Sequence, residues 1–412
     1  MPPMNVALMD LVIKITIKNF MISNRIIVLT ILIMFMHNGF SQPNTFITKR
    51  ENLNANLKKI RQNNSFLCQA KKELLNAANK IINKKEVYSV TFKSQFPPSN
   101  SKNDFYSLSR YAWPDPESKN GLPYITIDGK INPEIKEIPD SYMLGNLSSD
   151  VYILGLAYFF TENEKYSRWV KKIIDVFFIN EKTKMNPSFK YSHIVKGKNV
   201  SSSTIGSMVF LKLIDGIQLI KPSKNWTAGD HKDLGNWFKR FLEWLINSEQ
   251  GKKNSVAPNN IGTYYTDQIA AYALFTNQPI LARNILNFQG KERIETQIDA
   301  QGKMPLELNR ATPWEYVKYN LTAFDYMVQI GNTINVDLLD YQNSKGGSIR
   351  KAFDWLLPFA TGQKKWTYGN QVSGNQIQIV LLRLNSVRYN GINYNGITNR
   401  FDYLEILTGD VY

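Results

Sequence analysis

From about residue 140 onward, apolar residues recur every three or four positions along the chain. The clearest apolar faces are Val151–Leu154–Ala157–Tyr158, Trp169–Ile173–Val176–Phe177, Leu234–Trp237–Phe238–Phe241–Leu245 and Ile349–Ala352–Phe353–Leu356–Leu357. This spacing predicts amphipathic helices of about ten to fifteen residues. Short polar turns separate them, and no alternating pattern of strands interrupts them. We therefore predict an all-α body over residues 141–412, built from helical hairpins in a solenoid or closed toroid.

Residues 42–140 show a different pattern. Weak helical spacing over about 44–86 predicts one or two lead-in helices. A long loop rich in proline, glycine and aromatic residues then follows, and Trp113 lies in its YAWPDP segment. Because a disordered linker rarely carries so many aromatic side chains, we expect this loop to pack on the helical body and to form a single domain with it.

The first 41 residues are typical of a secretory signal peptide. Arg25 precedes an apolar run from Ile26 to Met36, and small residues lie before Gln42. Met21 is an alternative start. The apolar run is too short for a comfortable membrane span, and an uncleaved anchor is the competing interpretation. We therefore expect a secreted or periplasmic protein without stable membrane insertion once the signal peptide is removed.

The amino-acid composition limits the classes of partner that the protein is expected to bind. The formal net charge is +16, and removal of residues 1–41 leaves 16 − 2 = +14. A basic chain favours an anionic polymer, and export together with the lack of a nucleic-acid-binding motif favours a polysaccharide over nucleic acid. Cys68 is the single cysteine, and His193 and His231 are the two histidines after residue 41. We expect neither a metal site nor a cofactor.

The stretch from Asn254 to Phe275 is the first candidate for a binding site. A polar segment with adjacent asparagines and adjacent tyrosines leads into an apolar helix. Such amides and phenols suit a polyhydroxylated, carboxylated ligand. The candidates are Asn259, Asn260, Tyr264, Tyr265 and Gln268. The alternative is a helix start with capping asparagines.

Two further segments carry similar chemistry. In PLELNRATPWEYVKYNLTAF, Arg310 precedes Tyr316 by six residues. Thr312 and Pro313 resemble a helix N-cap and first residue, so Tyr316 is expected on the first turn and Arg310 in the loop before it. The segment MNPSFKYSHIVKG supplies polar side chains from a second loop, namely Asn186, Tyr191, His193 and Lys196.

These residue types suit β-elimination on a uronic acid polymer. The C5 proton of a uronate is acidic enough to remove only when the carboxylate charge is neutralised, which amides and guanidinium groups can do. A tyrosine whose pKa a nearby cation lowers could accept this proton and then protonate the departing O4. The structural alternative is that Arg310 forms a loop ion pair and Tyr316 is a half-buried aromatic residue.

Four segments in this order resemble the alginate lyase superfamily of helical-toroid polysaccharide lyases, which includes polysaccharide lyase families five and thirty-eight. They are YAWPDPESKNGLPYITIDGKINPE, MNPSFKYSHIVKG, NNIGTYYTDQIAAYALFT and PLELNRATPWEYVKYNL. The resemblance implies an (α/α) toroid or incomplete barrel and eliminative cleavage of alginate, polymannuronate or glucuronan. It implies that Asn260 binds the carboxylate, Arg310 supports charge and Tyr316 is the catalytic tyrosine. The six-residue spacing is closer to family thirty-eight.

One position departs from the family pattern. Members usually carry Asn-Asn-His, whereas this chain has Ile261 in place of the histidine. One consequence is that Tyr316 acts as both base and acid, which requires the syn geometry of mannuronate or glucuronate. Another is that His193 replaces the missing imidazole, although a lone histidine is more often an ordinary hydrogen-bonding residue. The third is a non-catalytic protein that binds acidic polysaccharide on the same fold. Lining residues of the groove would include Trp113, Tyr191 and Lys196.

Overall fold

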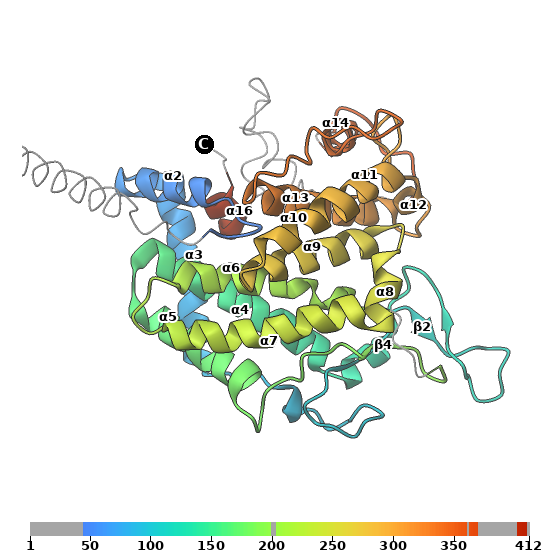
Figure 1. The fold of residues 1–412 in the computed structure, drawn as a ribbon, viewed down its shortest axis with the longest axis horizontal. Coiled ribbons are helices and arrows are strands. Elements are labelled where there is room, and N and C mark those ends of the chain that lie inside the picture. The colour runs from blue at the N-terminus through green and yellow to red at the C-terminus, as the bar shows by residue number, and fades with distance from the viewer. Residues whose placement is uncertain (1–43, 199–202, 361, 370–401, 410–412) are drawn as a thin grey trace, which may run out of the picture. The chain divides into compact units, whose positions relative to one another are not determined.

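The computed structural model describes residues 44–198, 203–360, 362–369 and 402–409. The proposed signal peptide and most of the expected C-terminal tail lie outside these residues. Helix accounts for 60% and strand for 3% of the structure, which confirms the prediction of an all-α fold (Figure 1). Residues Thr45–Tyr412 form one compact unit.

The longer helices are α2 (Arg50–Arg61), α3 (Ser65–Lys84), α4 (Asp140–Thr161), α5 (Glu164–Ile174), α6 (Phe210–Ile220), α7 (Ala228–Asn247), α9 (Asn260–Phe275), α13 (Pro313–Asn332) and α14 (Ile349–Ala360). Shorter helices are α8 (Glu249–Ser255), α10 (Pro279–Ile285), α11 (Lys291–Gln297), α12 (Pro305–Leu308) and α16 (Tyr403–Thr408). Single turns of 3-10 or π-helix are η1 (Val90–Phe92), η2 (Pro133–Glu137), η3 (Asp175–Ile179), η4 (Ile205–Val209) and η5 (Leu286–Gly290).

The helices form an inner and an outer set. In α4 and α9 the buried positions run without a break over 151–160 and 262–273, so these helices are covered on every side. Helix α6 is similarly buried, and α13 is buried over most of its length, except along the face at 315, 316, 319, 322 and 326. The pairs α4–α6 and α9–α13 pack directly against each other. In α3, α5 and α7 the buried residues recur at helical spacing along one face. These outer helices therefore match the amphipathic pattern of the sequence.

Two glycines set the contact between α4 and α6. A Cβ atom on Gly155 would lie 2.6 Å from the carbonyl oxygen of Gly216. A Cβ atom on Gly216 would lie 2.6 Å from the carbonyl oxygen of Val151. Because real Cβ atoms do not approach backbone oxygens this closely, a side chain at either position would push the helices apart. The two glycines thus permit a close backbone crossing in the inner set.

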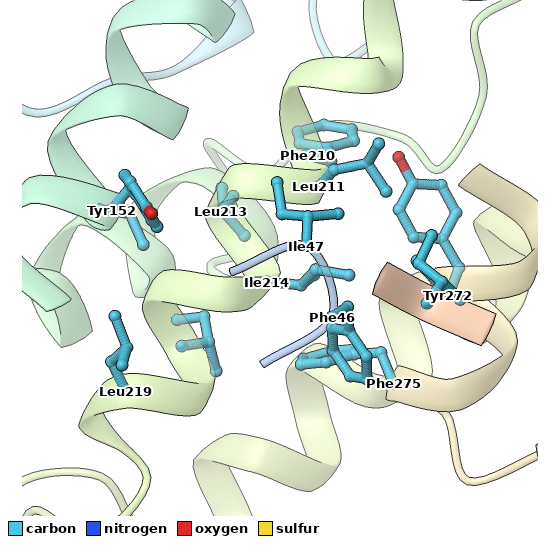
Figure 2. Close-up of a cluster of buried hydrophobic side chains, with 14 of the residues drawn as sticks. Phe46, Ile47, Tyr152, Phe210, Leu211, Leu213, Ile214, Leu219, Tyr272 and Phe275 are labelled. Atoms are coloured by element: carbon cyan, nitrogen blue, oxygen red, sulfur yellow. The ribbon is translucent and has the colours of Figure 1, made fainter. Parts of the chain in front are cut away.

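The segment before α2 is inserted among the inner helices. Figure 2 shows Phe46 and Ile47 beside side chains of α6 and α9, and Phe46 contacts Phe275 edge-on at 6.4 Å. The buried carboxylate of Asp215 accepts hydrogen bonds from the backbone N–H groups of Phe46 (2.6 Å) and Thr48 (2.9 Å). Burial raises the pKa of Asp215 to about 6, although these donors favour its charged form. The carboxylate therefore fixes the start of the described chain to the core.

The loop from residue 85 to 139 is ordered and contains short strands. Strand β1 (Tyr106–Leu108) pairs in parallel with β4 (Tyr191–Ile194), and β2 (Ala112–Trp113) pairs antiparallel with β3 (Ile125–Thr126). A buried ion pair joins Lys93 to Asp140 at the start of α4, with 3.0 Å between Nζ and Oδ2. Helices α2 and α3 lie within the segment of about 44–86, and buried Phe105 of the aromatic loop belongs to the hydrophobic core.

Candidate active site

Arg310 and Tyr316 meet at the start of α13. The helix begins at Pro313, as predicted, although the side chain of Thr312 makes no capping hydrogen bond. The guanidinium carbon of Arg310 lies 3.6 Å from the centre of the Tyr316 ring. The hydroxyl of Tyr316 is hydrogen-bonded to that of Tyr111, at 2.9 Å, from the aromatic loop. The structure therefore brings together a cation and two phenols from segments about two hundred residues apart.

The charge of Arg310 is compensated by Asp128 of the aromatic loop. Nε donates to Oδ2 at 2.9 Å, and Nη2 donates to Oδ1 of the same carboxylate. The backbone N–H of Ala311 also donates to Oδ2, at 3.0 Å. The hydrogen bond from Arg310 is the main reason that the pKa of Asp128 is lowered. The sequence alternative of a loop ion pair for Arg310 is therefore correct, and it coexists with the contact to Tyr316.

The pKa of Tyr316 is raised, contrary to the expectation that a nearby cation would lower it. Burial is the largest cause, and the hydrogen bond to Tyr111 adds to it. Arg310 lowers the pKa but does not outweigh these effects. The reason is that the ring is half-buried and that Asp128 already neutralises the guanidinium. Without substrate, Tyr316 is held as a neutral phenol.

Asn260 is buried at the start of α9 and is bound by Glu307 of α12. Its backbone N–H donates to Oε1 at 2.7 Å, and its side-chain nitrogen donates to both carboxylate oxygens at 2.9 Å. Burial raises the pKa of Glu307, while these bonds and Arg310 oppose the rise. Glu307 thus fixes the orientation of Asn260. To bind a substrate carboxylate, Asn260 would have to exchange one of these bonds.

Asn259 caps α9, as the structural alternative for this stretch predicted. Its side-chain oxygen accepts from the backbone N–H of Ile261 at 3.2 Å. Ile261 is partly buried on the first turn of α9, beside Asn260. The position of the family histidine therefore belongs to the same helix turn as the candidate carboxylate-binding asparagine.

His193 lies in β4 with a left-handed backbone conformation, φ 49°, which residues other than glycine rarely adopt. Its backbone N–H donates to Oγ of Ser107 at 2.9 Å. Burial, helped by the charge of Arg110 and opposed by a hydrogen bond with the backbone of Ser203, lowers the pKa of the imidazole to about 4, so the ring is neutral at neutral pH. Burial raises the pKa of Tyr319, and the charge of Arg110 opposes this rise, so Arg110 lies near both groups.

Tyr264, Tyr265 and Gln268 are buried in α9. The hydroxyl of Tyr264 donates to the carbonyl oxygen of Tyr319 at 3.0 Å, and Tyr264 also borders a cavity. Tyr265 donates to the carbonyl oxygen of Leu245, and Gln268 donates to that of Tyr264. Tyr265 and Gln268 are therefore core residues and do not form the wall of a groove, because α9 is covered on every side.

Three other predicted binding residues make contacts within the aromatic loop or to it. Nζ of Lys196 lies 2.6 Å from Oε2 of Glu134. Nε1 of Trp113 donates to the carbonyl oxygen of Lys130 at 2.8 Å. Tyr191 is paired with Tyr106 in the short sheet. These residues help to hold the aromatic loop in place, and the structure does not bring them into direct contact with Arg310 or Tyr316.

Sequence reasoning did not identify Arg110, Tyr111, Asp128, Glu307 and Tyr319 as site residues. Two of them could have been predicted from the sequence, because Tyr111 begins the YAWPDP segment and Glu307 lies three residues before Arg310. Asp128 carries no such signal, since its contact with Arg310 spans 182 residues.

A cavity of about 350 Å³ is bordered by Tyr264 of α9, Tyr319 of α13 and residues of α16. Among the described residues, no group of three or more histidine, cysteine, aspartate or glutamate side chains is placed to hold a metal ion. None of the helices within that part of the chain combines the length and apolar character needed to cross a bilayer.

Comparisons with known proteins agree on one family. The family model described as alginate lyase matches residues 89–366. The structure of an alginate lyase from Bacteroides ovatus is similar, with 32% sequence identity, a TM-score of 0.79, and coverage of 89% of this chain and 96% of that chain. No match was found among curated protein sequences.

Alginate lyase A1-III shares the fold at lower identity. Its complex with a tetrasaccharide has 14% identity and a TM-score of 0.55, covering 79% of this chain and 87% of that chain. The structure of the enzyme from Sphingomonas species A1 has 13% identity and a TM-score of 0.53, covering 79% and 88%. On the match of the family model and the 32% identity over nearly the whole chain, this protein belongs to the alginate lyase family and is a polysaccharide lyase.

Proposed function

We propose that this lyase cleaves a uronate polymer, either alginate or its polymannuronate blocks or glucuronan, by β-elimination at Tyr316. The observation that carries the proposal is the phenol of Tyr316 between the guanidinium of Arg310 and the hydroxyl of Tyr111. Asn260 lies at the adjacent helix start, where Glu307 orients its amide. A phenol flanked by a cation and a hydrogen-bonding partner can both accept and return a proton.

In the proposed reaction, the phenolate of Tyr316 removes the proton from C5 of the uronate. The electron pair of the C5–H bond forms the C4–C5 double bond while the C4–O4 bond breaks. The phenol of Tyr316 then returns the proton to O4 of the departing sugar. The products are a chain with an unsaturated uronate at its non-reducing end and a chain with a free hydroxyl, so atoms and electrons balance.

In this proposal, Asn260 and a cationic side chain neutralise the charge of the substrate carboxylate. Arg310 is already paired with Asp128, whereas Arg110 has an exposed side chain beside the ring of Tyr111, at 5.5 Å. We assign Arg110 as a further cation for the carboxylate, because preorganised positive charge stabilises the enolate that develops. This assignment also lessens the need for a histidine at the position of Ile261.

The identity of the base determines the sugar. If Tyr316 is both base and acid, both transfers occur on one face, and mannuronate and glucuronate are substrates while guluronate is a poor one. If the neutral imidazole of His193 is the base, an anti route to guluronate opens. The low pKa of His193 keeps the imidazole unprotonated at neutral pH, which permits this second route.

The decisive experiment follows the ultraviolet absorbance of the unsaturated product with polymannuronate, glucuronan and polyguluronate. We expect product with one of the first two polymers, and Tyr316→Phe to abolish turnover with little loss of binding, because only the hydroxyl is removed. Absence of product on all three polymers, with retention on an anionic-polymer gel, would instead support the non-catalytic binding protein. Retained turnover in Tyr316→Phe would show that another group is the base.

We further propose that the protein is exported and that it is related more closely to one polysaccharide lyase family than to another. The basic residue and apolar run within residues 1–41 support a signal peptide and a secreted or periplasmic location. The six-residue spacing from Arg310 to Tyr316 supports a closer relation to polysaccharide lyase family thirty-eight than to family five. We expect no metal dependence, so that chelation should leave the rate unchanged.

A further inference from the structure

Helix α11 carries two deeply buried polar residues, Arg293 and Gln297, with exposed fractions of 2% and 4%. They are four residues apart, so they project from the same side of the helix. Buried polar side chains of this size are stable in a protein interior only when they form hydrogen bonds. Their partners therefore show which parts of the fold this face of α11 holds in place.

Both residues bind the backbone that leads into α9. The guanidinium of Arg293 donates through Nη2 to the carbonyl oxygen of Ser255 and through Nη1 to that of Ala257, at 3.4 Å. Nε2 of Gln297 donates to the carbonyl oxygen of Asn259 at 3.3 Å. Three alternate carbonyls of one short segment are thus bound to α11, and the last of them belongs to the residue that caps α9.

Gln297 also accepts hydrogen bonds from two other helices. Oγ1 of Thr263, on the first turn of α9, donates to its Oε1 at 3.1 Å. Nδ2 of Asn320 on α13 donates to the same oxygen at 2.8 Å. Thr263 and Asn320 are both fully buried, so water does not compete for these bonds. The amide of Gln297 acts as donor and acceptor at once, which an apolar side chain of the same length cannot do.

Asn320 connects this network to the rest of the candidate active site. It follows Tyr316 by four residues on α13, which is about one helical turn. Its Nδ2 also lies 3.3 Å from Sδ of Met304, the residue directly before α12. Helix α12 carries Glu307, which orients the candidate carboxylate-binding asparagine. Gln297 and Asn320 therefore join α9, α12 and α13, the three helices that hold the candidate site.

Building on the proposed function, we propose that Gln297 is a positioning residue for the elimination. It fixes the start of α9, and with it Asn260, relative to the turn of α13 that carries Tyr316. Because Gln297 uses its donor and its acceptor at the same time, a shift between these helices would leave a buried polar group without a partner. The rate is sensitive to such shifts, since a displacement of about 1 Å can lower it about a hundredfold.

The test compares Gln297→Met with the wild-type protein. Methionine keeps the length and volume of the side chain but forms none of the three hydrogen bonds, so the core remains filled. We expect kcat on the cleaved polymer to fall about tenfold or more and KM to change less than about threefold, because the substrate still binds while the reacting groups are displaced. Gln297→Glu keeps the two acceptor contacts and should lose less of kcat, and it serves as the second variant if methionine disturbs folding.

The matched control is Asn56→Leu, which removes another buried amide. Nδ2 of Asn56 donates to the carbonyl oxygens of Leu407 (3.0 Å) and Gly409 (2.9 Å), so it joins α2 to α16 and not the helices of the candidate site. We expect this variant to lower Tm and to leave kcat unchanged at a temperature well below Tm. A fall in kcat of the same size in both variants would mean that Gln297 acts only through stability.

A double-mutant cycle tests the connection to α13. Asn320→Leu removes the bond from α13 to Gln297, and it should lower kcat by itself. In the double variant with Gln297→Met, we expect kcat to be close to that of Gln297→Met alone, because both changes break the same network. Effects on kcat that simply multiply would contradict a shared network.

Hydrogen–deuterium exchange measures the positioning without turnover. We expect Gln297→Met to speed exchange in residues 255–263 and 313–320, and Asn56→Leu to leave it unchanged there. Unchanged exchange in Gln297→Met would overturn the positioning, and faster exchange with a wild-type kcat would overturn its role in the reaction. Failure of the wild-type protein to cleave any polymer would overturn the proposed function alone, since exchange is compared independently of activity.

Discussion

At the scale of single residues, the candidate active site depends on contacts that oppose one another. Arg310 lies against the ring of Tyr316 and favours the phenolate, whereas burial and the bond to Tyr111 favour the phenol. The balance keeps Tyr316 protonated in the empty protein. A substrate that displaces the hydroxyl of Tyr111 would remove one of the effects that raise its pKa.

Removal of the Tyr111 hydroxyl should therefore change the pH dependence of the reaction. Because the hydrogen bond raises the pKa of Tyr316, Tyr111→Phe should lower that pKa. We expect the rise of kcat/KM with pH to occur at lower pH than in the wild type. A pH profile that is unchanged in Tyr111→Phe would mean that Tyr316 does not act as the base.

Glu307 provides a second test at this scale. Its carboxylate accepts two N–H groups of Asn260, and a glutamine would present a donor to one of them. We expect Glu307→Gln to lower kcat/KM by about tenfold to a hundredfold through misplacement of Asn260. The control is Glu292→Gln on the exposed surface of α11. Equal kinetics in the two variants would exclude an orienting role for Glu307.

At the scale of elements, the contact between α9 and α13 contains two fully buried carboxyl groups, Asp267 and Asp325. Within the described residues, neither oxygen of Asp267 has a hydrogen-bond partner. Burial and the neighbouring Asp325 raise the pKa of Asp267, and Arg293 only partly opposes this. The folded protein therefore keeps this proton to a higher pH than the unfolded chain does.

This linkage predicts a stability that falls with pH. Below the usual aspartate pKa of 3.8 both states are protonated, and above it only the unfolded chain ionises freely, so the free energy of unfolding decreases as pH rises. Asp267→Asn should raise Tm at pH 8 by about 2 °C or more, with a smaller gain at pH 4. The exposed Asp233→Asn on α7 is the control. An equal Tm for wild type and Asp267→Asn at pH 8 would contradict the prediction.

At the scale of the whole molecule, the positive formal charge, which is +16 for the full sequence and +14 without residues 1–41, governs the encounter with substrate. Long-range attraction to a polyuronate is screened by salt, whereas packing of the inner helices is not. Raising NaCl from about 0.05 to 0.5 M should increase KM for a polyuronate several-fold with little change in Tm. A KM that is insensitive to salt would show that short-range contacts alone bind the polymer.

Much of the helical architecture could be predicted because the formation of a helix depends mainly on residues that are close together in the sequence. Apolar residues at helical spacing predicted the hairpins, Pro313 predicted the start of α13, and adjacent asparagines predicted a cap for α9. The same pattern could not distinguish the α9 side chains that would line a substrate groove from those that are buried in the core. Tyr265 and Gln268 have polar atoms but lie inside, because this helix is covered on every side.

The sequence by itself determined the all-α class and the close approach of Arg310 to Tyr316, since both depend on spacing along one or two neighbouring segments. Only the tertiary structure determined which residues form hydrogen bonds with Arg310 and Tyr316. Asp128 and Tyr111 reach them from a loop nearly two hundred residues away, and the segment at Ile47 and Thr48 borders one cavity together with α16, from opposite ends of the described chain. The physical reason is that periodicity encodes which face of a helix turns inward, whereas the partner of a charged group and the complete burial of a helix such as α9 depend on which segments the fold packs against it.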